Sequence, residues 1–427
     1  MNGIRKAIGL AAAIAIAFAM SVDAEGSAKA KTDITILIGK PEIVEQLDLM
    51  VAAFNASHPD INATIVPLAN QNMMQKLTVL YASKNVPTIL NMSQEFPSFK
   101  DKLLDLSRES WVKHAFKGTL DTVTEKGKVL GMPMTVEAFG LLYNKDVLDK
   151  AVGKFDPSSI KTRADLEHLI AAVEKSMPQG AVHVSPMDWS LGAHFTNVLF
   201  ADQSSDQAKR LAFLDSMKAG KVDLQKNALF NGWLDTFDLL KAHNANKASP
   251  LAPVYDDGVL ALASGKVGFW FMGNWALPNL REANPKGTFG FLPVPISNSP
   301  TDYGNAQISV GVPAYWTIDA SLSTPAQQDA AKIFLNWLVS SDEGQDFYVN
   351  KFSFIPVFDD FRAAPKDALS VQIVQYMKEG KTLEWMNNRY PADGWPTMGA
   401  LMQKYLGGVI DRKTLAKGIS DYWKSVK

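Results

Sequence analysis

The first hundred residues alternate between two hydrophobic periods. Three short apolar runs have the composition of buried strands: 33–38, 61–66 and 88–92. Between the first two runs, apolar residues recur three or four positions apart, at Ile43, Leu47, Met50, Val51 and Phe54. A second helical pattern covers 73–83. This alternation of strand and helix predicts a parallel sheet with right-handed crossovers.

The rest of the chain continues as a mixed α/β pattern. It is mostly helical over 162–240 and returns to strand patterns at 289–295 and 308–318. A helix follows Thr324, and its expected apolar face consists of Ala330, Ile333, Phe334, Trp337 and Leu338. Ser341 then stands at the N-cap position of the next helix. Because 427 residues exceed the size at which one core keeps growing, we expect two lobes, with more than one crossing between them.

The N-terminus has the pattern of a secretory signal. Two basic residues, Arg5 and Lys6, precede an uncharged run at 7–20. Small residues then stand at the positions that a signal peptidase recognises, Val22 and Ala24. The run is shorter than the roughly 20 apolar residues that cross a bilayer. We therefore expect a signal peptide at 1–24, with a second cleavage position after residue 30.

Composition narrows the class of protein. The chain has no cysteine, so it lacks the residue that carries the acyl chains of a lipoprotein, and we expect it to be free in the periplasm. Lys and Arg number 43 against 44 Asp and Glu, so we expect no nucleic-acid partner. Ten tryptophans in a charge-balanced chain favour a neutral ligand with apolar faces, such as a sugar ring, although core packing uses aromatics too.

Catalytic and metal motifs are missing from the sequence. The six histidines are scattered, at positions 58, 114, 168, 183, 194 and 243, without the spacing of zinc ligands. The sequence contains neither a nucleophile elbow nor a phosphate-binding glycine loop. We therefore predict no enzyme activity, cofactor or metal. A glycosidase, which needs only two suitably spaced carboxylates among 44 acidic residues, stays open as an alternative.

Three stretches, 127–146, 265–275 and 311–345, together resemble the maltose-binding type of bacterial extracellular solute-binding proteins. The first contains Val136-Glu137-Ala138 and ends in Tyr143-Asn144-Lys145-Asp146, and the second is a Gly-bounded strand that ends in Gly273-Asn274-Trp275. The third joins Gly311-Val312-Pro313 to the helix around Trp337 and to Ser341-Asp342-Glu343-Gly344-Gln345. The resemblance covers nearly all of the chain after the signal segment.

This resemblance implies the two-lobed type II periplasmic binding protein fold. Each lobe would be a mainly parallel sheet flanked by helices, and the lobes would close on a ligand about hinge strands. The expected N-terminal lobe comprises 31–135 and 294–340, and the expected C-terminal lobe comprises 142–288 and 345–427. The hinge is expected near 136–141, 289–293 and 341–344.

Two residues are the leading candidates for ligand contact. Glu137 is the only charge between Pro133 and Lys145, in an otherwise largely apolar run, so it is either paired structurally or used on a ligand. The resemblance places it on a hinge strand that faces the cleft. Trp275 ends a Gly-bounded strand, and the resemblance places its indole at the floor of the site, where it would stack on a sugar ring. Packing in the core is the alternative for this tryptophan.

The other candidates follow strand ends or match loops of the family. Gln94 and Glu95 follow the third predicted strand and Lys40 and Glu42 follow the first, at the carboxyl edge where open α/β sheets bind ligands. By resemblance, ligand-contacting loops of the second lobe carry Asp188, Trp189, Arg389 and Trp395. For all of these residues, a solvated loop position is the alternative.

The sequence thus predicts a monomeric periplasmic protein that captures a carbohydrate, most simply an oligosaccharide, for an inner-membrane ABC permease. One alternative is a binding protein for a polyol or for an anionic glycerol derivative or sulfosugar, for which only Lys40 and Arg389 are candidate anion ligands. The alternative of another class is a secreted glycoside hydrolase.

Overall fold

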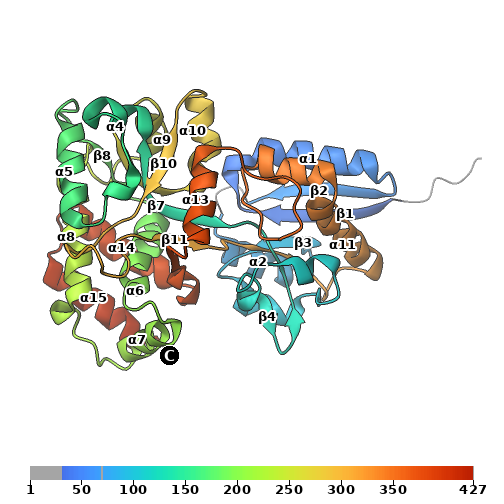
Figure 1. The fold of residues 1–427 in the computed structure, drawn as a ribbon. Coiled ribbons are helices and arrows are strands. Elements are labelled where there is room, and N and C mark those ends of the chain that lie inside the picture. The colour runs from blue at the N-terminus through green and yellow to red at the C-terminus, as the bar shows by residue number, and fades with distance from the viewer. Residues whose placement is uncertain (1–30, 69–70, 427) are drawn as a thin grey trace, which may run out of the picture.

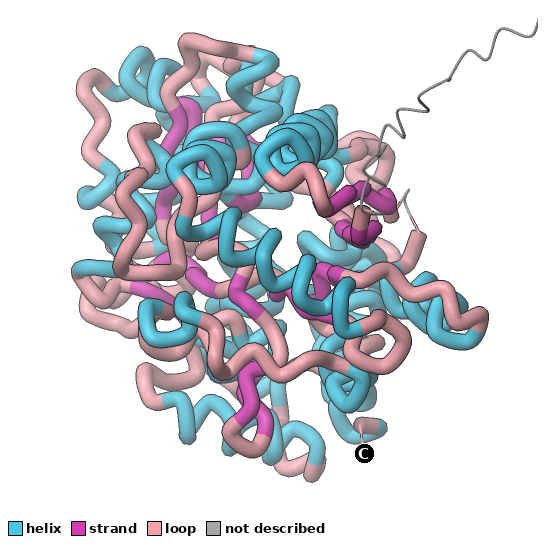
Figure 2. Tube along the Cα trace, turned by 90° about the vertical axis from the view of Figure 1, so that its right-hand side faces the viewer, coloured by secondary structure: helices cyan, strands magenta, loops and turns pink. Residues whose placement is uncertain are grey.

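The computed structural model describes residues 31–68 and 71–426, so the expected signal peptide at 1–24 lies outside the described residues. The described chain forms two lobes, each built on its own sheet (Figure 1). Figure 2 shows the same molecule turned by 90°, with helices around the strands. Within 31–68 and 71–426, none of the helices is long and apolar enough to cross a membrane.

The first sheet has the order β2-β1-β3-β12-β6. Its strands are β1 (Thr32–Ile38), β2 (Ile61–Pro67), β3 (Ile89–Met92), β6 (Met132–Pro133) and β12 (Tyr315–Ile318). The helices beside it are α1 (Val44–Ser57), α2 (Met73–Ala82), α3 (Phe96–Phe99), α11 (Pro325–Ser340) and α12 (Asp342–Asp346). The predicted parallel pairing holds for β1 with β2 and β3. β12 runs antiparallel to both of its neighbours, β3 and β6.

Aromatic packing joins the start of the chain to a distant helix. Phe54 on α1 is fully buried, and its ring lies 4.9 Å from that of Phe334 and 5.4 Å from that of Trp337 on α11. Figure 1 shows these two helices beside the first sheet. Ile333 lies on the opposite side of α11, where it is 43% exposed, so its assignment to the buried face was wrong. Ser341 caps α12 as predicted, since its hydroxyl accepts a hydrogen bond from the Gly344 amide.

The second sheet has the order β13-β11-β7-β9-β8, with β10 also paired to β7. Its strands are β7 (Glu137–Asn144), β8 (Val182–His183), β9 (Phe269–Gly273), β10 (Phe289–Leu292), β11 (Ile308–Gly311) and β13 (Thr382–Glu384). Its helices are α4 (Lys145–Val152), α5 (Arg163–Glu174), α6 (Thr196–Ala201), α7 (Gln207–Lys218), α8 (Ala228–Ala242), α9 (Tyr255–Ala263), α10 (Leu277–Ala283), α13 (Ala368–Lys378), α14 (Gly394–Leu406) and α15 (Arg412–Ser425). A short hairpin in the first lobe pairs β4 (Thr124–Glu125) with β5 (Lys128–Val129).

Strand pairing places the crossings between the sheets differently from two of the predicted hinge segments. The segment 289–293 lies in the second sheet, because β10 pairs with β7. β11 pairs with β7 as well, so that residues 308–311 lie in the second lobe and not in the first. The apolar run 308–318 is two strands: Pro313, which has no N–H for a ladder, lies where the chain passes from β11 to β12.

The other crossings follow from the same pairings. The chain leaves β6 in the first sheet and enters β7 in the second, so the first crossing lies at 134–136, at the edge of the predicted hinge segment 136–141. The segment after α12 remains with the first lobe, where Ile355 bridges to Val136 and Phe358 to Ala115. The last crossing therefore falls between Phe358 and α13, later than 341–344. Local hydrophobicity does not reveal which sheet a short apolar run joins.

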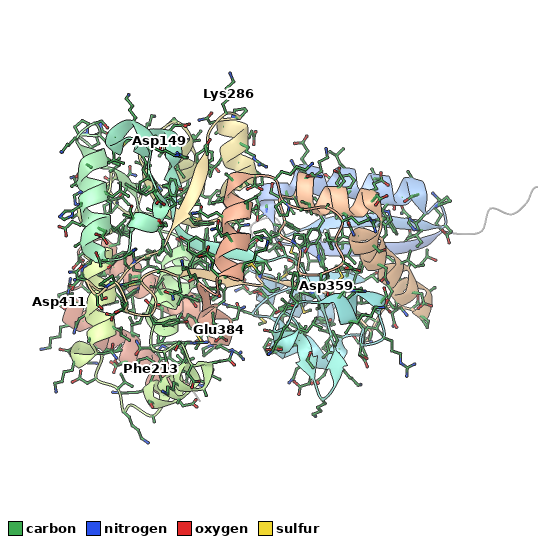
Figure 3. The ribbon with its side chains drawn as sticks, in the orientation of Figure 1. Asp149, Phe213, Lys286, Asp359, Glu384 and Asp411 are labelled. Atoms are coloured by element: carbon green, nitrogen blue, oxygen red, sulfur yellow. The ribbon has the colours of Figure 1, made fainter. Side chains whose placement is uncertain are left out.

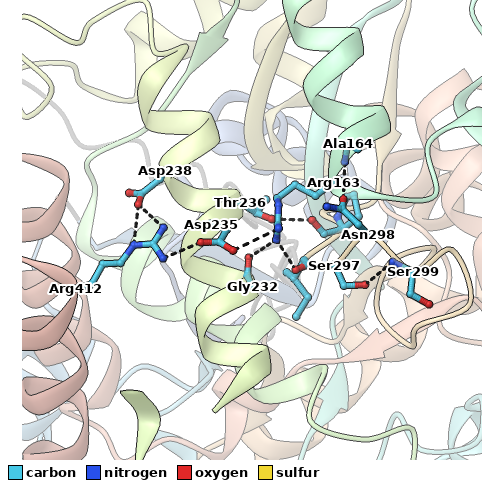
Figure 4. Close-up of polar contacts among 12 residues, drawn as sticks. Arg163, Ala164, Gly232, Asp235, Thr236, Asp238, Ser297, Asn298, Ser299 and Arg412 are labelled. Carbon is cyan, nitrogen blue, oxygen red and sulfur yellow. Dashed lines mark hydrogen bonds and ion pairs between the residues drawn. The ribbon is translucent and has the colours of Figure 1, made fainter. Parts of the chain in front are cut away.

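A charged network ties together helices of the second lobe (Figure 4). Arg412 at the start of α15 pairs with Asp238 at 2.6 Å and with Asp235 at 2.7 Å, both on α8. Arg163 on α5 pairs with Asp235 at 3.3 Å and donates to the Ile296 carbonyl. The network fixes α5, α8 and α15 relative to one another on the outside of the lobe.

Candidate ligand-binding site

A cavity of about 620 Å³ lies between the two lobes. The first lobe contributes the loops that follow β1 and β3, at Gly39, Lys40, Pro41, Glu42, Ser93, Gln94 and Glu95. Glu137, the first residue of β7, and Pro313, in the crossing from β11 to β12, contribute as well. The second lobe contributes Trp189, Ala193, His194, Tyr255, Asp256, Trp275, Asn279, Trp385, Asn387, Asn388 and Trp395. The volume of this cavity falls within the range of small-molecule binding sites.

The first wall forms because β1 and β3 are adjacent and parallel. Their carboxyl ends meet at one edge of the sheet, and the polar residues that follow them are brought together there. Lys40, Glu42, Gln94 and Glu95 all line the cavity, so the predicted grouping of these four residues is found in the structure. Burial raises the pKa of Glu95, although the Ser93 amide donates a hydrogen bond to its carboxylate.

An ion-paired cluster forms the polar part of the cavity wall. Glu137 is 3% exposed and pairs with the ammonium of Lys40, which also lies 3.0 Å from the Glu42 carboxylate. Burial opposes the charge on Lys40, but the two carboxylates outweigh it and raise the pKa of Lys40. Burial raises the pKa of Glu137, and Lys40 acts in the opposite direction. Both interpretations of Glu137 therefore hold in geometry: it is structurally paired, and it faces the cavity.

Trp275 owes its position to the glycine two residues before it. A Cβ on Gly273 would lie 1.9 Å from the Trp275 ring, so only glycine lets the indole fold back over the end of β9. The Asn274 side chain accepts a hydrogen bond from the Ala138 amide at 2.8 Å and so ties this turn to β7, next to Glu137. The Trp275 ring is partly exposed and lines the cavity.

The two segments that carry Trp189 and Trp395 are in close backbone contact. Trp189 precedes a π-helix at Ser190–Phe195, and Trp395 is the second residue of α14. A Cβ on Gly192 would lie 2.0 Å from the Trp395 carbonyl, and a Cβ on Gly399 would lie 2.5 Å from the Asp188 carbonyl. These glycines let the two helices touch, which sets both indoles at the cavity. The Trp189 ring lies 6.2 Å from that of Trp275.

One hydrogen bond spans the cavity directly. The Trp395 indole N–H donates to the Gln94 side-chain oxygen, which joins the second lobe to the first. Together with the pair of Lys40 and Glu137, it holds the two walls in contact in this conformation.

The structure does not bring two of the predicted residues to the cavity lining. Asp188 accepts a hydrogen bond from the Trp189 amide at 2.8 Å, so its carboxylate supports the start of the π-helix. Arg389 pairs with Glu384, labelled in Figure 3, at 3.2 Å and lines a neighbouring cavity of about 420 Å³. That neighbouring cavity shares Trp385 and Asn388 with the first.

Several lining residues have no counterpart among the sequence predictions, chiefly His194, Tyr255, Asp256, Trp385 and Asn387. They lie at the ends of elements whose local pattern resembles ordinary core. A search for aromatic residues next to glycine or proline breaks would have nominated Tyr255, which follows the loop over 248–254, but not the others. Burial raises the pKa of Tyr255, so its hydroxyl stays protonated and donates to Asn279.

One exposed group of three possible metal ligands occurs in the part of the chain that the structure describes: His114, Asp359 and Asp360. The two ring nitrogens of His114 each face a different carboxylate, at 2.8 Å for Asp359 and 3.5 Å for Asp360. Because each ring nitrogen already faces a carboxylate, the three side chains form a polar cluster at the surface.

Comparison with known proteins identifies the family. The model of the bacterial extracellular solute-binding proteins matches residues 49–372, and the chain belongs to this family. One relative is the multiple sugar-binding protein of Streptococcus mutans, 21% identical over 280 residues, which cover 62% of this chain and 63% of that protein. Another is the lactose-binding protein of Rhizobium radiobacter, 24% identical over 304 residues, which cover 69% and 67% of the two chains.

Solved structures confirm the fold. The binding protein RafE in complex with raffinose is similar with a TM-score of 0.78 at 18% identity, covering 92% of this chain and 99% of that one. The predicted α/β, two-lobed type II binding-protein fold is therefore confirmed. At this level of identity the likeness concerns the fold alone, and the ligand has to be argued from the residues of this chain.

Proposed function

We propose that this protein captures an oligosaccharide in the cavity between its lobes, as the substrate-binding component of an ABC importer. The observation that carries the proposal is the combination in one cavity of four tryptophans, at 189, 275, 385 and 395, with a cluster of carboxylates. Indole faces cover the C–H faces of sugar rings, and carboxylates accept hydrogen bonds from their hydroxyls. The names of the relatives, for sugars, lactose and raffinose, support the same ligand class.

The charge of the lining argues against an anionic ligand. Four lining residues are acidic, Glu42, Glu95, Glu137 and Asp256, whereas Lys40 is the one basic residue among them. The Lys40 ammonium is already engaged by Glu137 and Glu42. A phosphate or sulfonate would therefore meet repulsion and no free cation, which places the anionic alternative behind a neutral sugar.

The same cluster argues against glycoside hydrolysis. A glycosidase needs one carboxyl as an acid and another as a free base or nucleophile. In this cavity the Lys40 ammonium lies between two carboxylates and contacts both Glu42 and Glu137. Because both carboxylates already contact the Lys40 ammonium, neither is free to attack a sugar or to activate a water molecule, so we propose binding without turnover.

The remaining parts of the proposal concern the setting of the protein. We propose that residues 1–24 direct export, that the mature chain is a monomer in the periplasm without a lipid anchor, and that it needs neither cofactor nor nucleic acid. We further propose that the lobes close on the sugar about the crossings at 134–136, 312–314 and 359–367 and deliver it to an inner-membrane permease.

A thermal-shift screen of protein lacking residues 1–24 tests the ligand class. Raffinose, lactose, maltose and N,N′-diacetylchitobiose are each compared at millimolar concentration with sorbitol and glycerol 3-phosphate. Binding to the native state raises its free energy of unfolding by mass action, so at least one oligosaccharide raises the melting temperature. A shift with glycerol 3-phosphate and with none of the sugars would overturn the proposal, and release of a free monosaccharide during incubation would show an enzyme.

A further inference from the structure

His194 stands at the centre of the aromatic wall of the cavity. Its ring stacks on Phe139 with the ring centroids 4.5 Å apart and an interplanar angle of 23°. The rings of Trp275 and Trp189 lie at 4.9 Å and 5.4 Å from it. The residue belongs to the π-helix Ser190–Phe195, which Gly192 anchors against α14. Its orientation is therefore fixed by packing on several sides.

The two nitrogens of this imidazole have different surroundings. Nδ1 is covered completely and has no hydrogen-bond partner among the described residues. Nε2 also bonds to none of them but is not covered, and because His194 lines the cavity, Nε2 is the nitrogen that remains open to it. Nδ1 lacks a partner in either tautomer, but a buried N–H without an acceptor is rarer in proteins than a buried acceptor without a donor, so a bare Nδ1 is the less unfavourable state. The arrangement favours the tautomer with the proton on Nε2.

The charge state of the ring is consistent with this geometry. Burial, together with a smaller contribution from the nearby ammonium of Lys40, lowers the pKa of His194 to about 3. The imidazole is thus neutral at physiological pH and has a single N–H to offer.

Among the charged groups of this cavity, acceptors outnumber donors, with four carboxylates against one ammonium. The carboxylates of the lining only accept hydrogen bonds when ionised. The Lys40 ammonium is engaged by Glu137 and Glu42, and the Trp395 N–H by Gln94. The hydroxyls of a sugar can satisfy the acceptors, but its ring and glycosidic oxygens and the carbonyl of an N-acetyl group can only accept. Such an oxygen needs a donor from the protein.

We propose that His194 determines specificity by donating a hydrogen bond from Nε2 to an acceptor-only oxygen of the bound sugar. The inference rests on the proposed function and assigns one side chain a particular part in it. His194 would fix which edge of the sugar ring faces the aromatic wall, while Trp275 and Trp189 supply the stacking surface.

Calorimetric titration of three proteins tests the inference, each lacking residues 1–24: wild type, His194→Phe and His194→Gln. Phenylalanine keeps the stack on Phe139 and removes both nitrogens, whereas the glutamine amide nitrogen reaches about the position of Nε2. The titrants are raffinose, lactose, maltose and N,N′-diacetylchitobiose. For the sugars that bind the wild type, we expect His194→Phe to raise Kd by about tenfold, the effect of one hydrogen bond, and His194→Gln to recover part of it. The exposed His168 on α5 provides the matched control, His168→Gln.

The outcomes separate this inference from the proposed function. If no sugar binds the wild type, the proposed function fails. If sugars bind the wild type and His194→Phe equally well, or if His194→Phe and His194→Gln lose the same affinity, the donor role is wrong and the function stands. Should a variant not fold, ¹⁵N-histidine NMR of the wild type gives the answer: the Nε2 resonance of His194 moves on addition of the sugar, and an unmoved resonance overturns the inference.

Discussion

At the scale of single residues, small side chains decide where the large aromatic ones lie. The indole of Trp275 occupies the space that a Cβ on Gly273 would fill, and Trp385 lies over Gly311 in the same way, 2.4 Å from its missing Cβ. Both glycines stand at strand ends, on β9 and β11. The Gly-x-Trp spacing therefore has a local physical reason, which is why Trp275 could be nominated from the sequence.

The buried His183 and the half-buried His194 give the protein a defined sensitivity to acid. Burial lowers the pKa of His183 to about 4 and that of His194 to about 3. Both groups bind a proton near pH 6.5 when the chain is unfolded, so the unfolded state takes up protons that the native state does not. The contribution of the neutral rings to the free energy of unfolding is complete above pH 6.5. It is lost as the pH falls from 6.5 toward the native pKa values of about 4 and about 3.

We predict that, as the pH falls from 6 to 4, each of these histidines lowers the free energy of unfolding by up to about 1.4 kcal/mol per pH unit. Urea denaturation of the wild type and His194→Phe at pH 6.5, 5.5 and 4.5 measures this effect. The variant should lose stability less steeply as the pH falls. Buried carboxyls with raised pKa, such as Glu95, act in the opposite direction in both proteins and cancel from the difference. Parallel curves would show that the pKa of His194 is not lowered in the native state.

At the scale of elements, local periodicity explains the first lobe and non-local pairing explains the second. β1, α1 and β2 are predictable because each shows its period within one segment. The place of β10 and β11 is not predictable in this way, because both are assigned by their pairing with β7, more than 140 residues earlier. A proline ends the ladder at residue 313, but the sequence does not say that the chain then changes sheets.

The cavity lining follows the same division. Glu137 and Trp275 lie in motifs, and Lys40, Glu42, Gln94 and Glu95 follow strands that periodicity reveals, so these six could be nominated. His194 could not, because it lies in a helical segment of apolar and small residues and reaches the cavity through the contact between the π-helix and α14. Arg389 was nominated because it stands near Trp395 in the sequence, but its guanidinium pairs with Glu384 on β13 and does not line the cavity.

The contact between the π-helix and α14 is open to direct test by Gly399→Ala. In an isolated helix this change is stabilising by about 1 kcal/mol. Here the new Cβ would lie 2.5 Å from the Asp188 carbonyl, and we expect a net loss of about 1–3 kcal/mol, the usual effect of overpacking. Sugar affinity should fall too, since Trp189 and Trp395 move apart. The control is Ala400→Val on the exposed side of the same helix. A variant as stable as wild type with full affinity would contradict the packing argument.

At the scale of the whole molecule, the described part of the chain passes three times between the two main sheets. The cavity lies where these passages and the strand ends of both lobes meet, and the bond between Gln94 and Trp395 joins its walls. Glu95 and Trp275 line this cavity from different lobes, so a sugar in contact with both would touch both lobes at once, which is why we propose that the lobes close on it. The family assignment and the fold agree with that geometry.

The central claim is that the tryptophan-lined cavity binds an oligosaccharide, and calorimetric titration of wild type and Trp275→Ala, both lacking residues 1–24, tests it most directly. The matched control is Trp111→Phe, a buried tryptophan of the first lobe that does not line the cavity. We predict saturable one-to-one binding of at least one of raffinose, lactose, maltose and N,N′-diacetylchitobiose to wild type and control. With Trp275→Ala we predict a loss of affinity of tenfold or more, from about 1.4 kcal/mol or more of stacking. Equal affinity in all three proteins would contradict the account.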